Sequence, residues 1–241
     1  MTGLEKLTPD NWTPAPLHGP GLEVLHLDED LVAVVKPADM NVHREQRAGA
    51  RGRHALQTVS RQIGRYVFPV HRLDRNTSGI LVFALSAEAA TSLQAGWPEA
   101  TKTYLTLVRG ETPESFVSEK PLKGSTGEPQ PARSTFRRLA TFSRCSLLEV
   151  TIDTGRKHQI RRHLSALAHQ VIGDSSYGKG RINRFFRDEY GLPRMFLHAT
   201  RLKVAHPVTG EPLAWHVPLP DDLRGFLDRL PDVSPDQLSQ W

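Results

Sequence analysis

The chain has 241 residues, of which 38% are hydrophobic and 24% are charged, and its formal net charge is +5 at pH 7. These proportions are close to those of ordinary globular proteins. No apolar run approaches the length of a membrane span, the start lacks the apolar core of a signal peptide, and the single cysteine, Cys145, excludes an internal disulfide. We therefore expect a cytoplasmic protein, and the basic charge favours a polyanionic partner.

The first half of the chain is predicted to contain three strands and two helices. Residues 1–20 carry four prolines and little periodicity, which indicates a flexible N-terminal arm. The strands are expected at 22–27, 31–35 and 80–85. One amphipathic helix is marked by Leu56, Val59, Ile63 and Val67, and a second runs from its N-cap, Ser86, to about Gly96.

The second half is richer in strands. Alternating apolar residues predict strands at 101–108, 148–152 and 196–204, and Pro207 and Gly210 flank a turn. Asp221 or Asp222 is expected to cap a final helix that bears Leu223, Phe226, Leu227 and Leu230. Strand-rich blocks with scattered helices favour an α+β fold over a regular βαβ alternation. We expect one domain over 21–220, followed by a C-terminal helix and tail over 221–241.

The most informative stretch is 71–79, which reads HRLDRNTSG and directly precedes the apolar run 80–84. Asp74 stands there between Arg72 and Arg75, at the mouth of a buried strand. Asp is seldom buried unless it is paired. This carboxylate is therefore either an ion-pair strut that fixes a turn or a chemical reagent.

A strongly basic segment lies at 156–163, where six of the eight residues are Arg, Lys or His. Apolar residues recur at helical spacing, at Ile160, Leu164 and Leu167, which predicts an amphipathic helix that opens after Gly155. Positive charge in a first turn opposes the helix dipole, so an anion held nearby would explain it better than local stability. The alternative is a solvated basic face. Further basic clusters lie at 133–144 and 181–187.

Together these segments resemble the pseudouridine synthases of the RluA type. That family carries an H-R-L-D-x-x-T-S-G block, matched here from His71 to Gly79, and a G-R-x-H-Q-[IL]-R block, matched from Gly155 to Arg161. Its K-x-Y strand is matched at 102–104. Its closing L-H-A and H-P-x-T-G-E segments are matched at 197–199 and 206–211. The blocks occur in the family's order and span most of the chain.

The resemblance implies a fold and a reaction. The fold would be a mixed, largely antiparallel bent sheet flanked by helices, in a single catalytic domain without a separate RNA-binding module. The reaction turns uridine into pseudouridine: the N1–C1′ bond breaks and C5 is joined to the sugar, so no cofactor or metal is expected. The family places the reacting carboxylate at Asp74, an aromatic partner at Tyr104, and at Arg161 an arginine that keeps the carboxylate ionised, here expected as a bidentate pair.

The resemblance also implies an RNA partner. A uridine within a stem must be flipped out before a side chain can reach it. The candidate RNA contacts are Arg72, Arg75, Lys102, Arg156, Lys157, His158 and Arg162. A finer match over 161–175 and at 183–184 resembles the branch that modifies the uridine at position sixty-five, in the acceptor stem of certain tRNAs. We therefore expect a tRNA substrate and a monomer without an obligate protein partner.

The same segments are also compatible with other interpretations. A pseudouridine synthase acting on ribosomal RNA would share the main blocks, and a non-catalytic RNA-binding protein could retain the fold. A metal-dependent hydrolase is less favoured, because no H-E-x-x-H motif occurs. The segment 173–180 nearly matches a P-loop, but Gly180 replaces the hydroxyl residue that would bind magnesium. His198 and His206 are expected to be structural hydrogen-bonding groups.

Overall fold

The apolar runs of the chain form the strands of a ten-stranded sheet in the computed structural model, which describes residues 17, 19–43, 53–142 and 144–231. The strands are β1 (Glu23–Leu27), β2 (Leu31–Lys36), β3 (Phe68–Pro69), β4 (Ser78–Ala84), β5 (Thr101–Arg109), β6 (Ser115–Ser118), β7 (Leu122–Lys123), β8 (Pro129–Gln130), β9 (Ser134–Phe142), β10 (Cys145–Ile152), β11 (Leu197–Ala205) and β12 (Pro212–His216). The helices are α1 (Ala55–Ile63), α2 (Ala87–Ala95), α3 (Gln159–Ala166), α4 (Gly180–Tyr190) and α5 (Asp221–Leu227).

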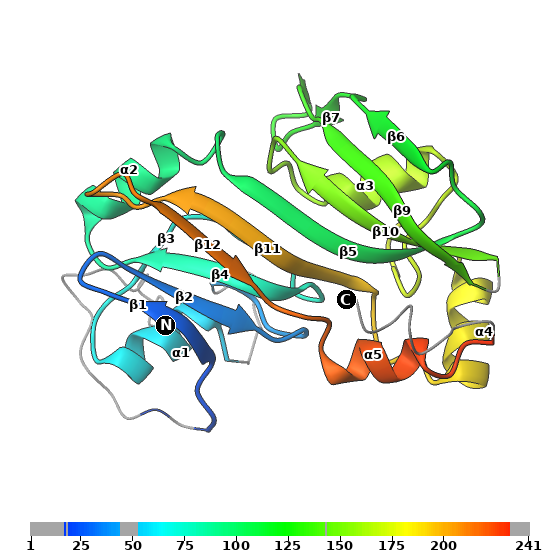
Figure 1. Ribbon diagram of the computed structural model, residues 1–241, viewed down its shortest axis with the longest axis horizontal. Helices are drawn as coiled ribbons and strands as arrows, with labels where there is room; N and C mark the ends of the chain where they lie inside the picture. The colour runs from blue at the N-terminus through cyan, green and yellow to red at the C-terminus, as the bar shows by residue number, and fades with distance from the viewer. Residues whose placement is uncertain (1–16, 18, 44–52, 143, 232–241) are drawn as a thin grey trace, which may run out of the picture.

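The main sheet has the order β1-β2-β4-β11-β5-β10-β9-β6, with β3 beside β4 and β12 beside β11, while β7 and β8 pair separately. Neighbouring strands are antiparallel except β4 and β11, which run parallel. The predicted α+β fold with a mixed, largely antiparallel sheet is thereby confirmed. Figure 1 shows β5 and β11 crossing the middle of the molecule, with β1 and β2 at one end and β6 and β9 at the other.

The parallel contact between β4 and β11 is short and opens into a fork. Ser78 and Gly79 pair with His198 and Ala199, whereas farther along β4 pairs with β3 and β11 pairs with β12. Gly79 has a φ of 119°, and a Cβ at this position would lie 2.1 Å from the carbonyl oxygen of Ala199. Only glycine therefore permits the two strands to approach this closely.

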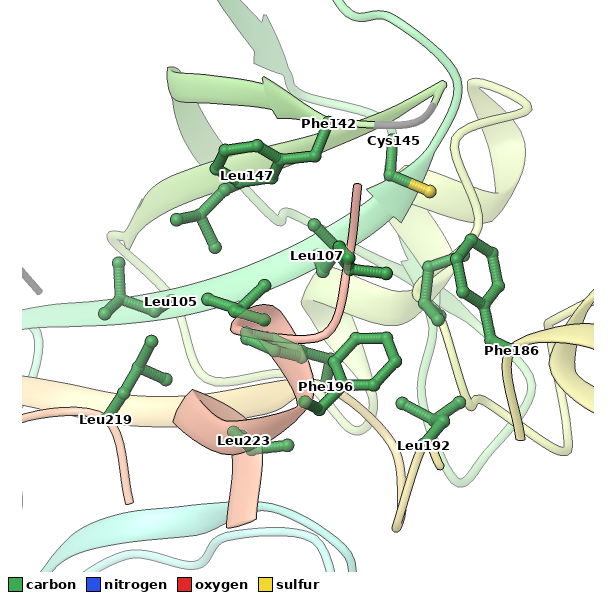
Figure 2. Close-up of a cluster of buried hydrophobic side chains, with 14 residues drawn as sticks. Leu105, Leu107, Phe142, Cys145, Leu147, Phe186, Leu192, Phe196, Leu219 and Leu223 are labelled. Atoms are coloured by element: carbon green, nitrogen blue, oxygen red, sulfur yellow. The ribbon is translucent and has the colours of Figure 1, made fainter. Parts of the chain in front are cut away.

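Both faces of the sheet are covered, because successive residues of a strand point to opposite sides. Leu105 and Leu107 of β5 join a cluster that includes Phe186 of α4 and Phe226 of α5, and Figure 2 shows Phe196 and Leu223 within this cluster. Tyr104, on the same strand, instead packs against the clusters that contain α1 and α3. The side chain of Tyr104 therefore faces the side of the sheet that carries α1 and α3.

The predicted helices are present, but three of them differ in detail. α1 ends at Ile63 because Gly64 adopts a left-handed φ of 68°, so Val67 is buried in the following loop and not in the helix. α3 begins only at Gln159, which leaves residues 156–157 in a turn before the helix and not in its first turn. α5 has Pro220 at its N-cap instead of Asp221 or Asp222, although Oδ1 of Asp222 accepts the first-turn N–H of Leu223. α2 is capped by Ser86 as predicted.

Other elements were not predicted from the sequence, namely α4, β3, β6, β7, β8, β9 and β12. α4 buries only Asn183 and Phe186, so its apolar stripe is too thin to be recognised by periodicity. β9 is half-exposed over much of its length and carries two arginines. Among the described residues no helix combines the length and the apolar character that crossing a membrane requires. Most of the expected arm at 1–20, and 232–241 of the expected tail, lie outside the described residues.

Candidate active site

Asp74 lies in the loop that leads into β4, with its side chain about one-fifth exposed. The buried ammonium of Lys36 organises this loop by donating hydrogen bonds to the carbonyl oxygens of Pro37, Met40 and Arg75, at 2.7, 2.8 and 3.2 Å. Burial is the main cause that lowers the pKa of Lys36, to about 7, although the charge of Asp74 opposes the shift. The bond to the carbonyl oxygen of Arg75 thus fixes the backbone next to Asp74.

The guanidinium of Arg161 reaches Asp74 from the other side of the sheet's fork. Its Nη1 donates to Oδ2 of Asp74 at 2.8 Å, while its Nε and Nη2 donate to the two carboxylate oxygens of Asp174 at 2.7 and 2.9 Å. The structure therefore brings Asp74 and Arg161 together, but the expected bidentate pair is wrong. The bidentate edge of Arg161 is used by Asp174, and Asp74 receives a single hydrogen bond.

Asp174 is fully buried and holds Arg161 in place. Its Oδ1 also accepts the backbone N–H groups of Ser176 and Tyr177. Burial alone would raise the pKa of Asp174, but these hydrogen bonds, led by that of Arg161, outweigh burial and lower it. Burial likewise opposes the charge of Arg161, yet its bonds to Asp174 and Asp74 raise the pKa of Arg161 above its usual value. Both members of this pair are therefore charged.

His158 stands at the N-cap of α3 with a left-handed φ of 54°. This conformation places its Nε2 3.7 Å from Oδ1 of Asp74, while its Nδ1 hydrogen-bonds the Tyr177 hydroxyl at 3.1 Å. Burial lowers the pKa of His158 although Asp74 opposes the shift, so the imidazole is neutral near pH 7. The ring of Tyr177 also lies 5.1 Å from the guanidinium carbon of Arg161.

Tyr104 lies in the middle of β5, paired with Val150 and Ala199 of the neighbouring strands. Burial, and then the negative charge of Asp74, raise the pKa of its phenol well above the ordinary value. The hydroxyl is therefore protonated at neutral pH. The aromatic ring of Tyr104 is available to contact a bound group.

Two residues of the matched blocks are less accessible than the sequence suggested. Nε2 of His71 accepts the backbone N–H of Val82, and the imidazole stacks on Trp97 with ring centres 4.3 Å apart. Burial lowers the pKa of His71 to about 3, consistent with a neutral acceptor. Lys102 is buried and donates to the carbonyl oxygen of Trp97 at 2.8 Å, so this candidate RNA contact does not present its ammonium at the surface.

The other candidate RNA contacts differ in how far their side chains are exposed and in what they contact. Arg72 and Lys157 are exposed, and Arg75 is exposed but paired with Asp39 at 2.8 Å. Arg156 and Arg162 are half-buried and donate to backbone carbonyl oxygens, those of Pro131 and of Lys123 and Lys157 respectively.

Two contiguous hollows meet at this cluster. The smaller one, of about 70 Å³, is lined by Asp74, Tyr104, Arg161 and Leu197 among others, and we call it the carboxylate hollow. The larger one, of about 510 Å³, lies where β4 and β11 diverge and is lined by Ile80, Lys102 and Arg201 among others, and we call it the fork hollow. Arg72, Tyr104, Ile152, Gly155 and Arg156 line both.

Sequence reasoning missed the two residues that fix the geometry, Asp174 and Lys36. In the sequence Asp174 stands out only as part of the P-loop-like segment 173–180 and of the finer family match. Its signal was an acidic residue two positions after the apolar pair Val171-Ile172, since a buried carboxylate needs a cationic partner. Lys36 carried a similar signal, because it closes an otherwise apolar strand.

Comparison with known proteins identifies the family. The sequence model of the family described as RNA pseudouridylate synthase matches residues 30–166. A relative from Vibrio cholerae named tRNA pseudouridine synthase C is 40% identical over 230 residues, which cover 86% of this chain and 94% of the relative. A Salmonella typhimurium protein of the same name is 40% identical, with 80% and 83% covered. The solved structure of human RNA Pseudouridylate Synthase Domain Containing 1 matches with a TM-score of 0.69 at 27% identity, over 92% of this chain and 96% of that one. The chain therefore belongs to the RNA pseudouridylate synthase family and is an RNA pseudouridine synthase, an isomerase.

Proposed function

We propose that this enzyme isomerises the uridine at position sixty-five of tRNA, and that Asp74 is the carboxylate that carries the reaction. The observation that supports the assignment is the hydrogen bond between Asp74 and the guanidinium of Arg161, which Asp174 holds through two further bonds. The fixed direction of Nη1 orients one oxygen of the Asp74 carboxylate. Support for tRNA as the substrate comes from the relatives named tRNA pseudouridine synthase C.

The proposed reaction divides one difficult exchange into two steps. A uridine flipped out of its stem enters the carboxylate hollow, and the uracil stacks on Tyr104. Attack by Asp74 on the nucleotide allows the N1–C1′ bond to break. The uracil turns, C5 bonds to C1′, and the carboxylate is released. The proton on C5 is lost and N1 gains one, so atoms and charge balance without an added reagent.

The substrate is tested by chemical mapping of pseudouridine in total RNA from cells with and without this protein. We expect one signal to disappear, at position sixty-five of tRNA. A change confined to ribosomal RNA would refute the tRNA assignment and favour the alternative substrate.

The role of Asp74 is tested with the variant Asp74→Asn, which keeps the shape of the side chain. We expect no product with an RNA that the wild type converts, while the Kd for that RNA changes by less than about threefold. Asp39→Asn is the matched control, because Asp39 pairs with Arg75 of the same loop but lines neither hollow. Product formation by Asp74→Asn would refute the assignment and leave the non-catalytic interpretation of this residue.

A further inference from the structure

The fork hollow offers space beside the carboxylate hollow that the isomerised uridine at Asp74 does not account for. Its volume of about 510 Å³ compares with about 70 Å³ for the carboxylate hollow, and neither Asp74 nor Arg161 lines it. The two hollows nevertheless share a wall that includes Arg72 and Tyr104. A group held in the fork hollow would therefore lie directly beside a nucleotide held at Asp74.

The charge around the fork hollow favours an anion. Among the described residues three arginines line it, Arg72, Arg156 and Arg201, together with the buried Lys102, against one carboxylate, Asp153. Asp153 is already paired with Arg133 at 2.9 Å. Exposed Arg201 is bonded at 2.7 Å to Glu149, which Arg137 also holds at 2.9 Å. Positive charge is therefore left over at the rim.

The remaining wall is suited to a flat heterocycle. Val70, Ile80 and Leu202 supply apolar surface, and the indole of Trp97 lies beside them with His71 stacked on it. Gln94 adds an amide whose Nε2 donates to the carbonyl oxygen of Pro69, which leaves its Oε1 as an acceptor. A cationic rim over an apolar floor with one amide matches the phosphate, ring and polar edge of a nucleotide.

We propose that the fork hollow binds a second nucleotide of the RNA, the immediate neighbour of the isomerised uridine. This inference rests on the proposed function, because it takes the uridine to lie at Asp74. Two consecutive nucleotides are then extruded together, one into each hollow. The short β4–β11 contact makes this possible, since a longer ladder would close the space between the two strands.

The test uses short RNA hairpins that carry the mapped uridine, intact or with an abasic site at its 5′ or its 3′ neighbour. Kd and the single-turnover rate constant are measured for the wild type and for Gln94→Trp, which fills the hollow from an exposed helical position. Arg201→Ala removes a rim cation and leaves Glu149 paired with Arg137. Arg65→Ala is the matched control, because exposed Arg65 pairs with Glu29 and lines neither hollow.

We expect one of the two abasic sites to raise the Kd of the wild type about tenfold, as loss of a stacked base does. In Gln94→Trp the same abasic site should change Kd less than about twofold, because the space is already filled. Arg201→Ala should reduce the slope of log K against log salt by about 0.7–0.9, and Arg65→Ala should not.

Equal effects of the abasic sites in the wild type and in Gln94→Trp, together with an unchanged salt slope in Arg201→Ala, would overturn the second-nucleotide site. A different result is that the intact hairpin is not isomerised while the abasic site still raises Kd in the wild type and not in Gln94→Trp. That result would refute the proposed reaction and support the fork hollow as a nucleotide site.

Discussion

Replacing Asp174 with Asn should destabilise the protein far more than a surface change of the same kind. In the wild type the buried guanidinium of Arg161 donates two hydrogen bonds to Asp174. In Asp174→Asn the guanidinium would face an uncharged amide, and the NH2 group of that amide is itself a donor. Removing one partner of a buried ion pair costs about 3–5 kcal/mol. Because Asp74 still accepts one bond from Arg161, we expect the lower end, about 3 kcal/mol.

Urea unfolding followed by circular dichroism measures this cost. With a denaturant slope of about 3 kcal/mol per molar, the midpoint should fall by about 1 M. The matched control is Asp153→Asn, whose carboxylate contacts Arg133 at 2.9 Å but is about half exposed. An exposed pair contributes at most about 1 kcal/mol, so the control should shift by less than about 0.3 M. A shift as small in Asp174→Asn would refute the view that this pair holds Arg161.

The pH dependence gives an independent check on the same residue. The pKa of Asp174 is lowered in the folded state, so its stabilisation is present above the unfolded-state pKa of about 3.9 and is lost as pH falls through the folded-state pKa. The difference in stability between wild type and Asp174→Asn should therefore be constant from pH 5 to 8 and should narrow only at more acid pH. A difference that vanished near pH 7 would contradict the assignment.

Three further changes test the surrounding geometry. Arg161→Lys should lower the single-turnover rate about 10–100-fold with the fold retained in circular dichroism, because an ammonium cannot serve two carboxylates as a planar fork does; a near-wild-type rate would contradict this. Lys36→Met should destabilise the protein. Between pH 7 and about 10 the stability of the wild type should rise relative to this variant, because folding lowers the pKa of Lys36 to about 7 while the unfolded chain stays protonated up to higher pH; parallel stability curves in urea titrations would argue against it. Gly79→Ala should separate β4 from β11 and reduce both midpoint and activity, whereas Gly127→Ala, with a similar φ of 87° but no atom within 4 Å of the added Cβ, should cost less; equal midpoints would remove the close-approach argument.

The sequence predicted which residues lie together at the site better than it predicted how they are bonded. The matched blocks pointed to Asp74, Tyr104 and Arg161, and the structure places all three around one hollow. Blocks of this kind record which residue types are present but not how a guanidinium divides its five donors. The bidentate partner of Arg161 is Asp174, and nothing in the local spacing distinguishes one buried acceptor from the other.

The helices and strands also differ in how well the sequence predicted them. Long apolar runs such as β4 and β5 were predictable because their burial is nearly continuous. α4 was not, because only two of its side chains are buried, Phe186 and Asn183. The amide of Asn183 accepts from Gly173 N–H and donates to the carbonyl oxygen of Asp174. Such contacts between distant segments leave no periodic signal in the sequence.

The position of the site follows from the topology of the sheet. Asp74 comes from the loop before β4, whereas Arg161 comes from α3, beyond β10 on the other side of the fork. Two residue pairs join β4 to β11, and the 2.8 Å hydrogen bond between Asp74 and Arg161 is a further link between segments on the two sides of the fork. A full ladder between these strands would close the fork hollow. Without any pairing between β4 and β11, the distance from the Asp74 carboxylate to the Arg161 guanidinium would not be fixed. A contact of two residues, allowed by the missing side chain of Gly79, provides both a fixed ion pair and an open hollow.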